Sequence, residues 1–359
     1  MRLKIIAAAL SAVSAMAGPA AADPGRVLLY NWSGYIAPDT AGRFQDATGK
    51  RLVLDTYGEA DEAEARLLAR GTGYDLAVVS SETVGRLVEA GAIRQIGLSG
   101  IPNAAAIDQQ LMQLYLDATP QAEGYTLPYL WGTTGIAYDR SAVLERLPDA
   151  PLDSWALVFD PANASKLADC GITLVDSVEE VVAAALAYLG LDPQSRSEQD
   201  IEAAFGVLSA IAPYVRAFDV DQYDALLGGE VCLAVTWSTD GLAPLLEQGT
   251  DRYHYAMPRE GTNLWADLFV IPSDAGDLEA SDQLMDFMLA PEMMAAAARF
   301  TNAISSVSFP KAGAGEPGFD SPAAALPLDA RGRLYLLPSR SGAEKRLLDR
   351  RWRLLQIGM

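Results

Sequence analysis

The chain has 359 residues with 50% apolar and 21% charged side chains, and 47 acidic residues against 27 Lys and Arg give a net charge of −20. The length indicates two domains with packed cores. The acidity argues against nucleic acid or an anionic membrane as a partner. An acidic surface mostly serves solubility, although it is also compatible with a cationic ligand.

The N-terminus has the pattern of a secretory signal peptide over residues 1–22. Arg2 and Lys4 form a positive n-region, an apolar stretch follows, and Ala20-Ala21-Ala22 offers a small-residue cleavage site. The apolar stretch is short for a transmembrane helix, and no cysteine near the cleavage site invites a lipid anchor. We therefore expect an exported protein that diffuses freely in a periplasm.

The chain has two cysteines, Cys170 and Cys232. An even count in an exported protein predicts one disulfide, and two free thiols are the less favoured alternative in an oxidising compartment. The single histidine, His254, leaves little for a zinc site, and there is no EF-hand loop for calcium. We expect neither a metal nor a cofactor.

Strand and helix patterns alternate along the first third of the chain. Strands are predicted at residues 27–31, 51–57 and 74–79, and helices at residues 40–48, 59–70 and 84–90. Such alternation indicates βαβ units and a mainly parallel sheet. The residues that follow the three strands should converge at the edge where open α/β sheets bind ligands.

Residues 128–138 have glycines on both sides of a threonine pair and are predicted to cross between the two domains. The expected division is a first lobe of residues 23–128 plus 248–309 and a second lobe of residues 129–247 plus 310–359. Further strands are predicted at 172–175 and 231–236, and helices at 179–189, 279–289, from Pro291 and at 344–355.

Aromatic and acidic residues recur after predicted strands. Trp32 and Tyr35 follow the first strand, and two later stretches pair Trp237 with Asp240 and Trp265 with Asp267, which we interpret as two further strand ends. Each aromatic residue alone could simply pack in a core. Together, the rings and carboxylates would suit an organic cation, because carboxylates are costly to bury unpaired and aromatic faces attract cations.

The motifs resemble those of the periplasmic putrescine/spermidine-binding proteins of ABC transporters. The matching segments are Tyr-Asn-Trp-Ser-x-Tyr-Ile-Ala-Pro-Asp-Thr from residue 30, Pro-Tyr-x-Trp-x-Thr-Thr-Gly-Ile from residue 128, and the segments 176–181, 188–190, 237–240 and 265–267. The resemblance covers nearly the whole chain after the signal peptide. It implies the α/β, two-lobe type II solute-binding fold, in which crossing strands hinge two mainly parallel, helix-flanked sheets.

The same resemblance implies a monomer that delivers a polyamine to an inner-membrane ABC permease. The pair Cys170 and Cys232 matches a disulfide of the putrescine-binding branch. Aromatic walls would hold the aliphatic stem, carboxylates and hydroxyls would hold the amines, and Glu180 would act from the second lobe. The implied ligand-binding residues are Trp32, Ser33, Tyr35, Ser80, Glu82, Glu180, Trp237, Asp240, Trp265 and Asp267.

One departure concerns the charge at one end of the cleft. Family members usually carry an acid where this chain has Gly34, and Glu82 is the candidate replacement. The competing hypothesis is a different amine or a monocation as the ligand. Trp265 is typical of the spermidine branch and Leu337 of the putrescine branch, so the motifs do not choose the amine.

Two alternative functions stay open from the sequence alone. The closed protein could signal to a chemoreceptor instead of feeding a transporter. Asp240 and Asp267 could also act as an acid and a base in a carboxylate-dependent hydrolase. No paired nucleophile and base, phosphate loop or dinucleotide fingerprint is visible, so we expect a binding protein with no catalytic residues.

Overall fold

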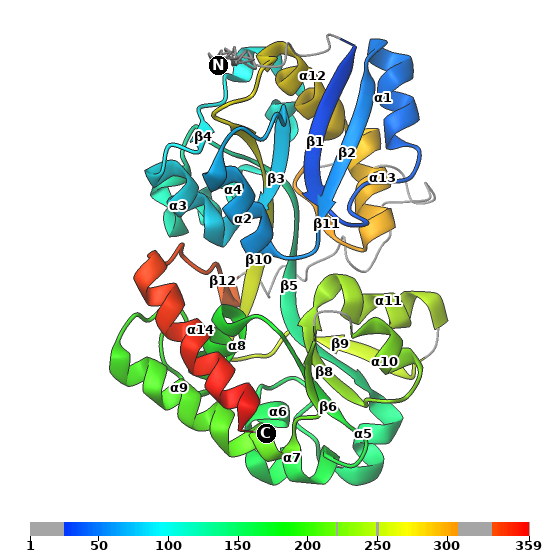
Figure 1. The fold of residues 1–359 in the computed structure, drawn as a ribbon. Helices are drawn as coiled ribbons and strands as arrows, with labels where there is room; N and C mark the ends of the chain where they lie inside the picture. The colour runs from blue at the N-terminus through cyan, green and yellow to red at the C-terminus, as the bar shows by residue number, and fades with distance from the viewer. Residues whose placement is uncertain (1–24, 220–221, 249–250, 308–331, 359) are drawn as a thin grey trace, which may run out of the picture.

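Two long strands run through both halves of the molecule and join them (Figure 1). The computed structural model describes residues 25–219, 222–248, 251–307 and 332–358, so the expected signal peptide lies outside the described residues. The joining strands are β5 (Leu127–Asp139) and β10 (Thr262–Pro272). They pair with each other in the middle of the molecule, and β5 then continues beside β8 and β9.

The first lobe has a sheet in the order β2-β1-β3-β10-β5. Its outer strands β1 (Arg26–Trp32), β2 (Arg51–Tyr57) and β3 (Leu76–Ser80) are parallel, and β10 is antiparallel to β3. The short strands β4 (Ile93–Arg94) and β11 (Ile304–Ser305) pair with β10 and β5. The lobe's helices are α1 (Thr40–Thr48), α2 (Ala60–Ala69), α3 (Ser81–Glu89), α4 (Gln109–Ala118), α12 (Leu278–Leu289) and α13 (Pro291–Thr301), with 3₁₀ turns at Leu98–Gly100, Pro102–Ala106 and Pro120–Ala122.

Helices cover both faces of this sheet because successive strand residues point to opposite sides. Val27 and Leu29 of β1 pack in the cluster that contains Phe44 of α1. Tyr30 belongs to a second cluster with Leu67 of α2. Strands that are buried on both faces read as continuous apolar runs, as the sequence does here.

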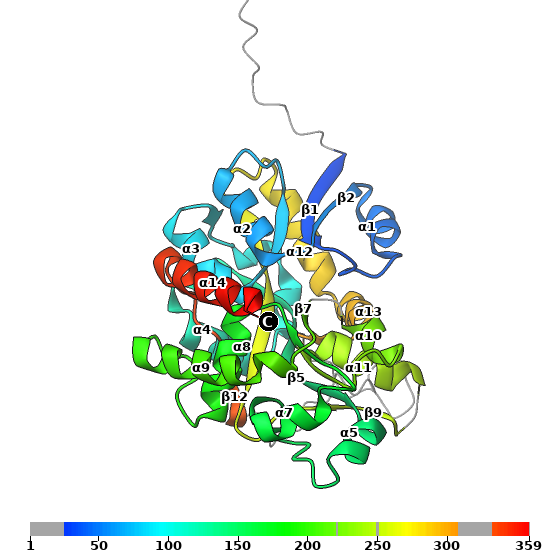
Figure 2. The ribbon, with the colours of Figure 1, turned by 60° about the horizontal axis from the view of Figure 1, so that its bottom comes forward.

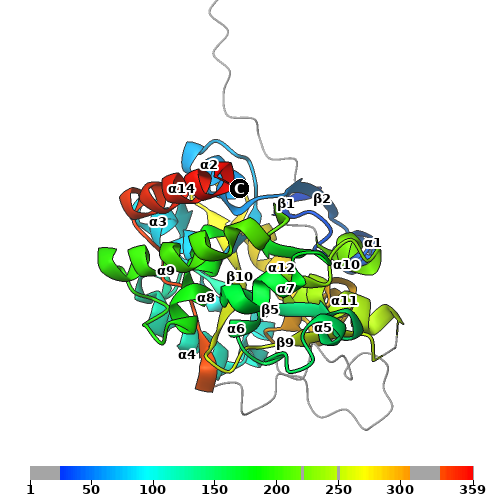
Figure 3. The same cartoon turned by 90° about the horizontal axis from the view of Figure 1, so that it is seen from below.

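The second lobe repeats the plan in the order β5-β8-β6-β7. Strands β6 (Ile172–Val175), β7 (Ala217–Asp219) and β8 (Leu233–Trp237) are parallel, and β5 is antiparallel to β8. Its helices surround the sheet when the lobe is seen from below (Figure 3). They are α5 (Arg140–Arg146), α6 (Ala156–Phe159), α7 (Pro161–Leu167), α8 (Val178–Tyr188), α9 (Glu198–Ile211), α10 (Tyr223–Leu227), α11 (Ser238–Gln248) and α14 (Gly342–Ile357), with a 3₁₀ turn at Ala212–Tyr214.

The C-terminal helix α14 connects the two lobes at their surface. A capping box begins it, because Ser341 and Glu344 satisfy each other's backbone N–H groups. Its buried face packs Leu348 and Trp352 into the core of the second lobe. Its Lys345 reaches Asp61 of α2 in the first lobe at 3.1 Å. Figure 2 shows α14 on the same side of the molecule as α2. The preceding strand β12 (Leu334–Tyr335) pairs with the start of β10.

The predicted α/β two-lobe fold is confirmed, with two corrections to detail. The expected return to the first lobe at residue 248 comes too early, because β9 (Tyr253–Ala256) pairs with the second-lobe half of β5. Trp265 and Asp267 do not follow a strand end but lie inside β10, because the strand continues from one lobe into the other. Among the described residues, no helix combines the length and apolar character needed to cross a membrane.

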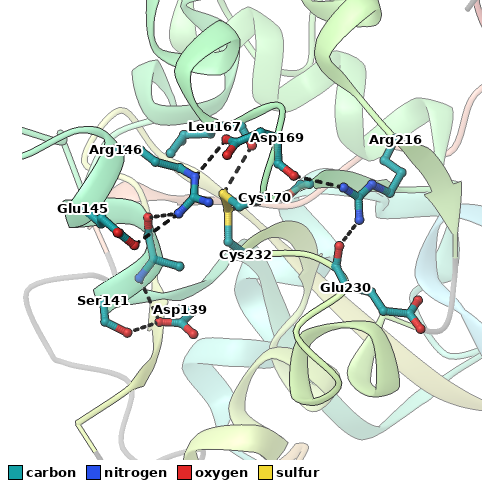
Figure 4. Close-up of a disulfide and its surroundings, with 12 residues drawn as sticks. Asp139, Ser141, Glu145, Arg146, Leu167, Asp169, Cys170, Arg216, Glu230 and Cys232 are labelled. Atoms are coloured by element: carbon teal, nitrogen blue, oxygen red, sulfur yellow. Dashed lines mark hydrogen bonds and ion pairs between the residues drawn. A yellow bond between two sulfur atoms is a disulfide. The ribbon is translucent and has the colours of Figure 1, made fainter.

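The predicted disulfide between Cys170 and Cys232 is present, with the two Cα atoms 5.4 Å apart. It joins the residues just before β6 and β8. Figure 4 shows the charged side chains around it: Arg146 pairs with Asp169 at 2.8 Å, and Arg216 donates to the carbonyl oxygen of Asp169 at 3.3 Å. The starts of two neighbouring strands are therefore joined covalently.

Candidate functional site

A cleft of about 800 Å³ separates the two lobes. Both lobes and the joining strand β10 contribute to its walls. All ten residues named from the sequence line this one cleft: Trp32, Ser33, Tyr35, Ser80, Glu82, Glu180, Trp237, Asp240, Trp265 and Asp267. The structure thus brings together residues that are up to 235 positions apart, while their role toward a ligand stays a prediction.

The first-lobe wall is built around the carboxylate of Asp267, which is 6% exposed. The indole Nε1 of Trp32 donates to Oδ1 at 3.0 Å and the hydroxyl of Tyr35 to Oδ2 at 2.6 Å, while the Ser80 hydroxyl makes a longer bond of 3.4 Å. Burial raises the pKa of Asp267 to about 6, although the three donors oppose the shift. The carboxylate is held in one orientation and is fully ionised only above that pH.

The second-lobe wall has a matching carboxylate on Glu180, in the first turn of α8. The indole Nε1 of Trp237 donates to it at 3.0 Å, and the hydroxyl of Thr134 donates to its other oxygen. Burial raises the pKa of Glu180, and hydrogen bonds from Thr134, Trp237 and Asn263 oppose the shift. Each lobe therefore presents a carboxylate that an indole N–H orients.

Three half-buried indoles form the apolar part of the cleft. Trp32 and Trp237 are the last residues of β1 and β8, and Trp32 also packs against the ring of Tyr57, with 4.5 Å between centroids. Trp265 donates its Nε1 to the carbonyl oxygen of Thr133 at 3.2 Å. A Cβ atom on Gly132 would lie 2.2 Å from the Trp265 ring, so only glycine there lets the indole lie against β5.

The loop after β1 shapes one end of the cleft. Gly34 lines it with a φ of +68°, a conformation that favours glycine, and a Cβ there would meet no atom within 4 Å. The loop therefore leaves space where a side chain could have projected. Ser33 donates both its backbone N–H and its hydroxyl to the carbonyl oxygen of Tyr57, at 2.9 and 3.2 Å, which fastens the loop to β2.

Two acidic residues enter the cleft from the first turns of helices that begin directly after strands. Glu82 is the second residue of α3, which starts after β3, and Asp240 is the third residue of α11, which starts after β8. Both line the cleft and are half-buried. Burial raises the pKa of Glu82 to about 8, and the negative charges of Glu179, Glu180 and Asp267 add to the shift.

Sequence reasoning missed two polar residues of the cleft. Glu179 is 8% exposed and its Oε2 has no hydrogen-bond partner, and the Oδ1 of Asn263, which is 3% exposed, has none either. Burial raises the pKa of Glu179, while Arg340, Lys345 and Arg86 oppose the shift. Asn263 could have been found, because alternate residues of β10 share one face with Trp265 and Asp267. Within the described ranges, no three His, Cys, Asp or Glu side chains are grouped to hold a metal ion.

Comparisons with known proteins place this chain in a class. A model of the bacterial extracellular solute-binding protein family matches residues 40–318. The chain belongs to this family, and the resemblance identified from its motifs is confirmed.

The relatives have names that describe their ligands. The chain is 39% identical over 303 residues to the putrescine/agmatine-binding protein of Pseudomonas aeruginosa, covering 81% of this chain and 82% of the relative. It is 32% identical over 365 residues to the putrescine-binding periplasmic protein PotF of Escherichia coli, covering 99% and 97%. The spermidine/putrescine ABC transporter substrate-binding protein PotD of Streptococcus pneumoniae superposes with a TM-score of 0.76 over 92% of this chain and 98% of that one; at 21% identity it shows the common fold.

Proposed function

We propose that this protein captures a diamine or polyamine of the putrescine type in the cleft between its lobes. The observation that carries the proposal is the pair of opposed carboxylates, Asp267 from the first lobe and Glu180 from the second, each oriented by an indole N–H. An amine with a positive charge at each end of an apolar stem would match two carboxylates separated by aromatic walls. The names of the relatives at 39% and 32% identity support the same ligand class.

The walls between the carboxylates suit the stem of such a ligand. Methylene groups gain from contact with indole faces, and an ammonium group near a ring gains about 1–2 kcal/mol of cation–π energy when it is desolvated. The ligand-binding set is the one named from the sequence, Trp32, Ser33, Tyr35, Ser80, Glu82, Glu180, Trp237, Asp240, Trp265 and Asp267, with Glu179 and Asn263 added from the structure. Within this set, Ser33 contributes by holding the loop after β1 in place through its hydrogen bonds to Tyr57.

The proposal also covers what happens after the amine has bound. The lobes close over the amine by hinge bending at β5 and β10, and the closed protein delivers it from the periplasm to an inner-membrane ABC permease without chemical change. The solute-binding family and the names of the relatives support this role. In this proposal the protein acts as a monomer, and both walls of the cleft come from its own two lobes.

A panel of amines tests the proposal on the purified protein. Putrescine, cadaverine, spermidine and agmatine are compared with butylamine, which keeps the stem and one charge only. A ligand that binds the folded state raises the melting temperature. At a ligand concentration one hundred times Kd, the free energy of unfolding increases by about 2.7 kcal/mol. We expect at least one of the multiply charged amines to raise it more than butylamine does.

The outcomes separate the alternatives. Equal shifts with butylamine and putrescine would favour a monocation ligand, and no shift with any amine would overturn the ligand class. Mass analysis of the recovered ligand tests the hydrolase alternative, because a binding protein returns the amine unchanged. Capture of the amine-loaded protein by the reconstituted permease, compared with capture by a chemoreceptor, tests the output.

A further inference from the structure

Glu82 differs from the other carboxylates of the cleft in how it is held. It lies in the first turn of α3, lines the cleft and is half-buried. Among the described residues, no side chain donates a hydrogen bond to it and no cation lies within ion-pair distance. Asp267, on the same lobe, has three side-chain donors. Glu82 is therefore a half-buried acid that no other side chain holds.

Arg86, a cation on the same helix, does not serve as a partner of Glu82. Arg86 lies one turn further along α3 and feels the charge of Glu82. Its guanidinium, however, binds both oxygens of Glu64 on α2 at 2.6 and 2.7 Å and donates to the carbonyl oxygen of Arg340 at 2.8 Å. A bidentate pair of this kind fixes the guanidinium in place, so Arg86 is held by Glu64.

The groups that face Glu82 from the other elements are acidic or neutral. Glu179 and Glu180 of α8 and Asp267 of β10 line the same cleft as Glu82, and their negative charges act on it. The phenols of Tyr57 on β2 and Tyr115 on α4 complete the set; burial raises the pKa of each, and the charge of Glu82 adds to it. Lys345 and Arg340 act on Glu179 instead.

This arrangement leaves the ionised form of Glu82 poorly compensated. The backbone N–H of Glu82 itself favours the carboxylate. Burial and three acidic neighbours act in the opposite direction and dominate. A cation placed between Glu82 and the acids of the other lobe would reverse this balance, because it would compensate several negative charges at once.

We propose that Glu82 is a proton-exchanging ammonium site: the free protein carries a proton on this carboxyl group, and an ammonium group of the ligand displaces it. The inference rests on the proposed amine-binding function. In the exchange, the neutral carboxyl group gives its proton to solvent, and the resulting carboxylate pairs with the incoming ammonium ion. One positive charge replaces another, and no covalent bond forms.

The exchange makes amine affinity depend on pH in a defined direction. With a pKa of about 8 in the free protein, Glu82 is about 0.9 protonated at pH 7. Binding then releases about 0.9 protons from this group, and affinity rises by nearly tenfold per pH unit between pH 6.5 and 7.5. The carboxyl group is half ionised at pH 8 and about 0.9 ionised at pH 9, so the gain fades between these pH values.

Calorimetry measures the exchange directly. Titration of the purified protein with putrescine at pH 7, in phosphate and in Tris, gives the number of released protons, because the two buffers take up a proton with different heats. We expect about one proton for the wild type. Glu82→Gln keeps the shape of the protonated acid and should release at most about 0.2, the remainder coming from acids such as Asp267, with its pKa of about 6.

Two variants serve as matched controls. Glu59→Gln removes an exposed carboxylate that lines the same cleft and should bind and release protons as the wild type does. Glu179→Gln removes a buried acid that faces Glu82 and should still release most of a proton. Glu82→Gln should also flatten the rise of affinity with pH and weaken putrescine at pH 8 by at least tenfold.

The possible failures can be told apart. Wild-type binding that releases no proton, or equal release by the wild type and Glu82→Gln, would overturn the exchange and leave the proposed amine binding intact. If no amine in the panel binds, the proposed function itself is wrong. If Glu82→Gln does not fold, the wild-type proton count and its pH profile still decide the question.

Discussion

Each lobe places in the cleft a carboxylate that accepts a hydrogen bond from an indole N–H, but the two carboxylates are held by different parts of the structure. In the first lobe, Trp32 at the end of β1 donates its indole N–H to Asp267, and in the second lobe Trp237 at the end of β8 donates to Glu180, at 3.0 Å in both cases. Asp267 sits on a strand that both lobes share, whereas Glu180 sits on a helix that belongs to one lobe.

The difference teaches how each carboxylate is kept in place. Asp267 gains its orientation from three side-chain donors of the first lobe. Glu180 also has three side-chain donors, but two of them, Thr134 and Asn263, lie on the joining strands β5 and β10. The second lobe has in addition a disulfide at the starts of β6 and β8. Both acids are thus held by hydrogen bonds; the donors of Asp267 all belong to its own lobe, and the second lobe adds a covalent link between the starts of two of its strands.

Removal of the disulfide should have the largest effect on stability and should fall on the second lobe. The bond closes a loop with a sequence separation of 62, which corresponds to about 4 kcal/mol in the chain-entropy model. We expect Cys170→Ser/Cys232→Ser to lower the free energy of unfolding by up to this amount in denaturant titrations. Hydrogen exchange should rise in β6 and β8 first; a uniform rise in both lobes would contradict the comparison.

Neutralising the two oriented carboxylates should have the next largest effect, on binding. Asp267→Asn leaves an ammonium group without its charge partner and also sets an amide N–H₂ against the donors Trp32 and Tyr35. We expect a loss of about 3 kcal/mol, roughly 100-fold in Kd by calorimetry, and a somewhat smaller loss for Glu180→Gln. Unchanged diamine affinity in both variants would show that these carboxylates do not pair with the ammonium groups of the ligand.

Removing the indole donors gives a matched pair of smaller changes. Trp32→Phe and Trp237→Phe each delete one N–H that binds a carboxylate and keep part of the aromatic wall. A hydrogen bond to a charged group contributes about 1.5–3 kcal/mol, so we expect about a tenfold weaker Kd in each case. Trp32→Phe should also move the acid limb of the binding profile above pH 6, because the lost donor favours the ionised form of Asp267.

The smallest change tests the long hydrogen bond of Ser80. At 3.4 Å to Asp267, this bond is weaker than the two others that the carboxylate accepts. We expect Ser80→Ala to weaken amine binding by only about 0.5 kcal/mol, roughly twofold, measured by the same calorimetry. A loss as large as that of Trp32→Phe would mean that Ser80 contacts the ligand itself.

Much of the fold could be predicted from local signals in the sequence. The helix over Thr40–Thr48 ends at Gly49, whose φ of +74° is the usual left-handed end of a helix, and β2 and β6 lie at the predicted residues. These boundaries depend on residues within a few positions of each other. The residues of the cleft could be named because the family motifs carry them in order.

What the sequence could not give is the set of contacts between distant segments. Nothing near Asp267 indicates that its donors come from positions 32 and 35, more than 230 residues away. The adjacent acids Glu179 and Glu180 look alike in sequence, yet one is oriented by Trp237 and the other keeps an unpartnered oxygen. The course of β10 through both lobes also depends on pairing with β5, which no local pattern encodes.

The shared strand β10 has a mechanical consequence. Trp265 and Asp267 lie in the stretch that passes from one lobe to the other, where β10 pairs with Gly132, Trp131 and Leu130 of β5. Two of the residues proposed to bind the ligand therefore lie in the strand that is also proposed as part of the hinge. If the proposed closure is right, a substitution that changes the choice of ligand at these two positions would also change how easily the hinge bends, so specificity and closure would be coupled.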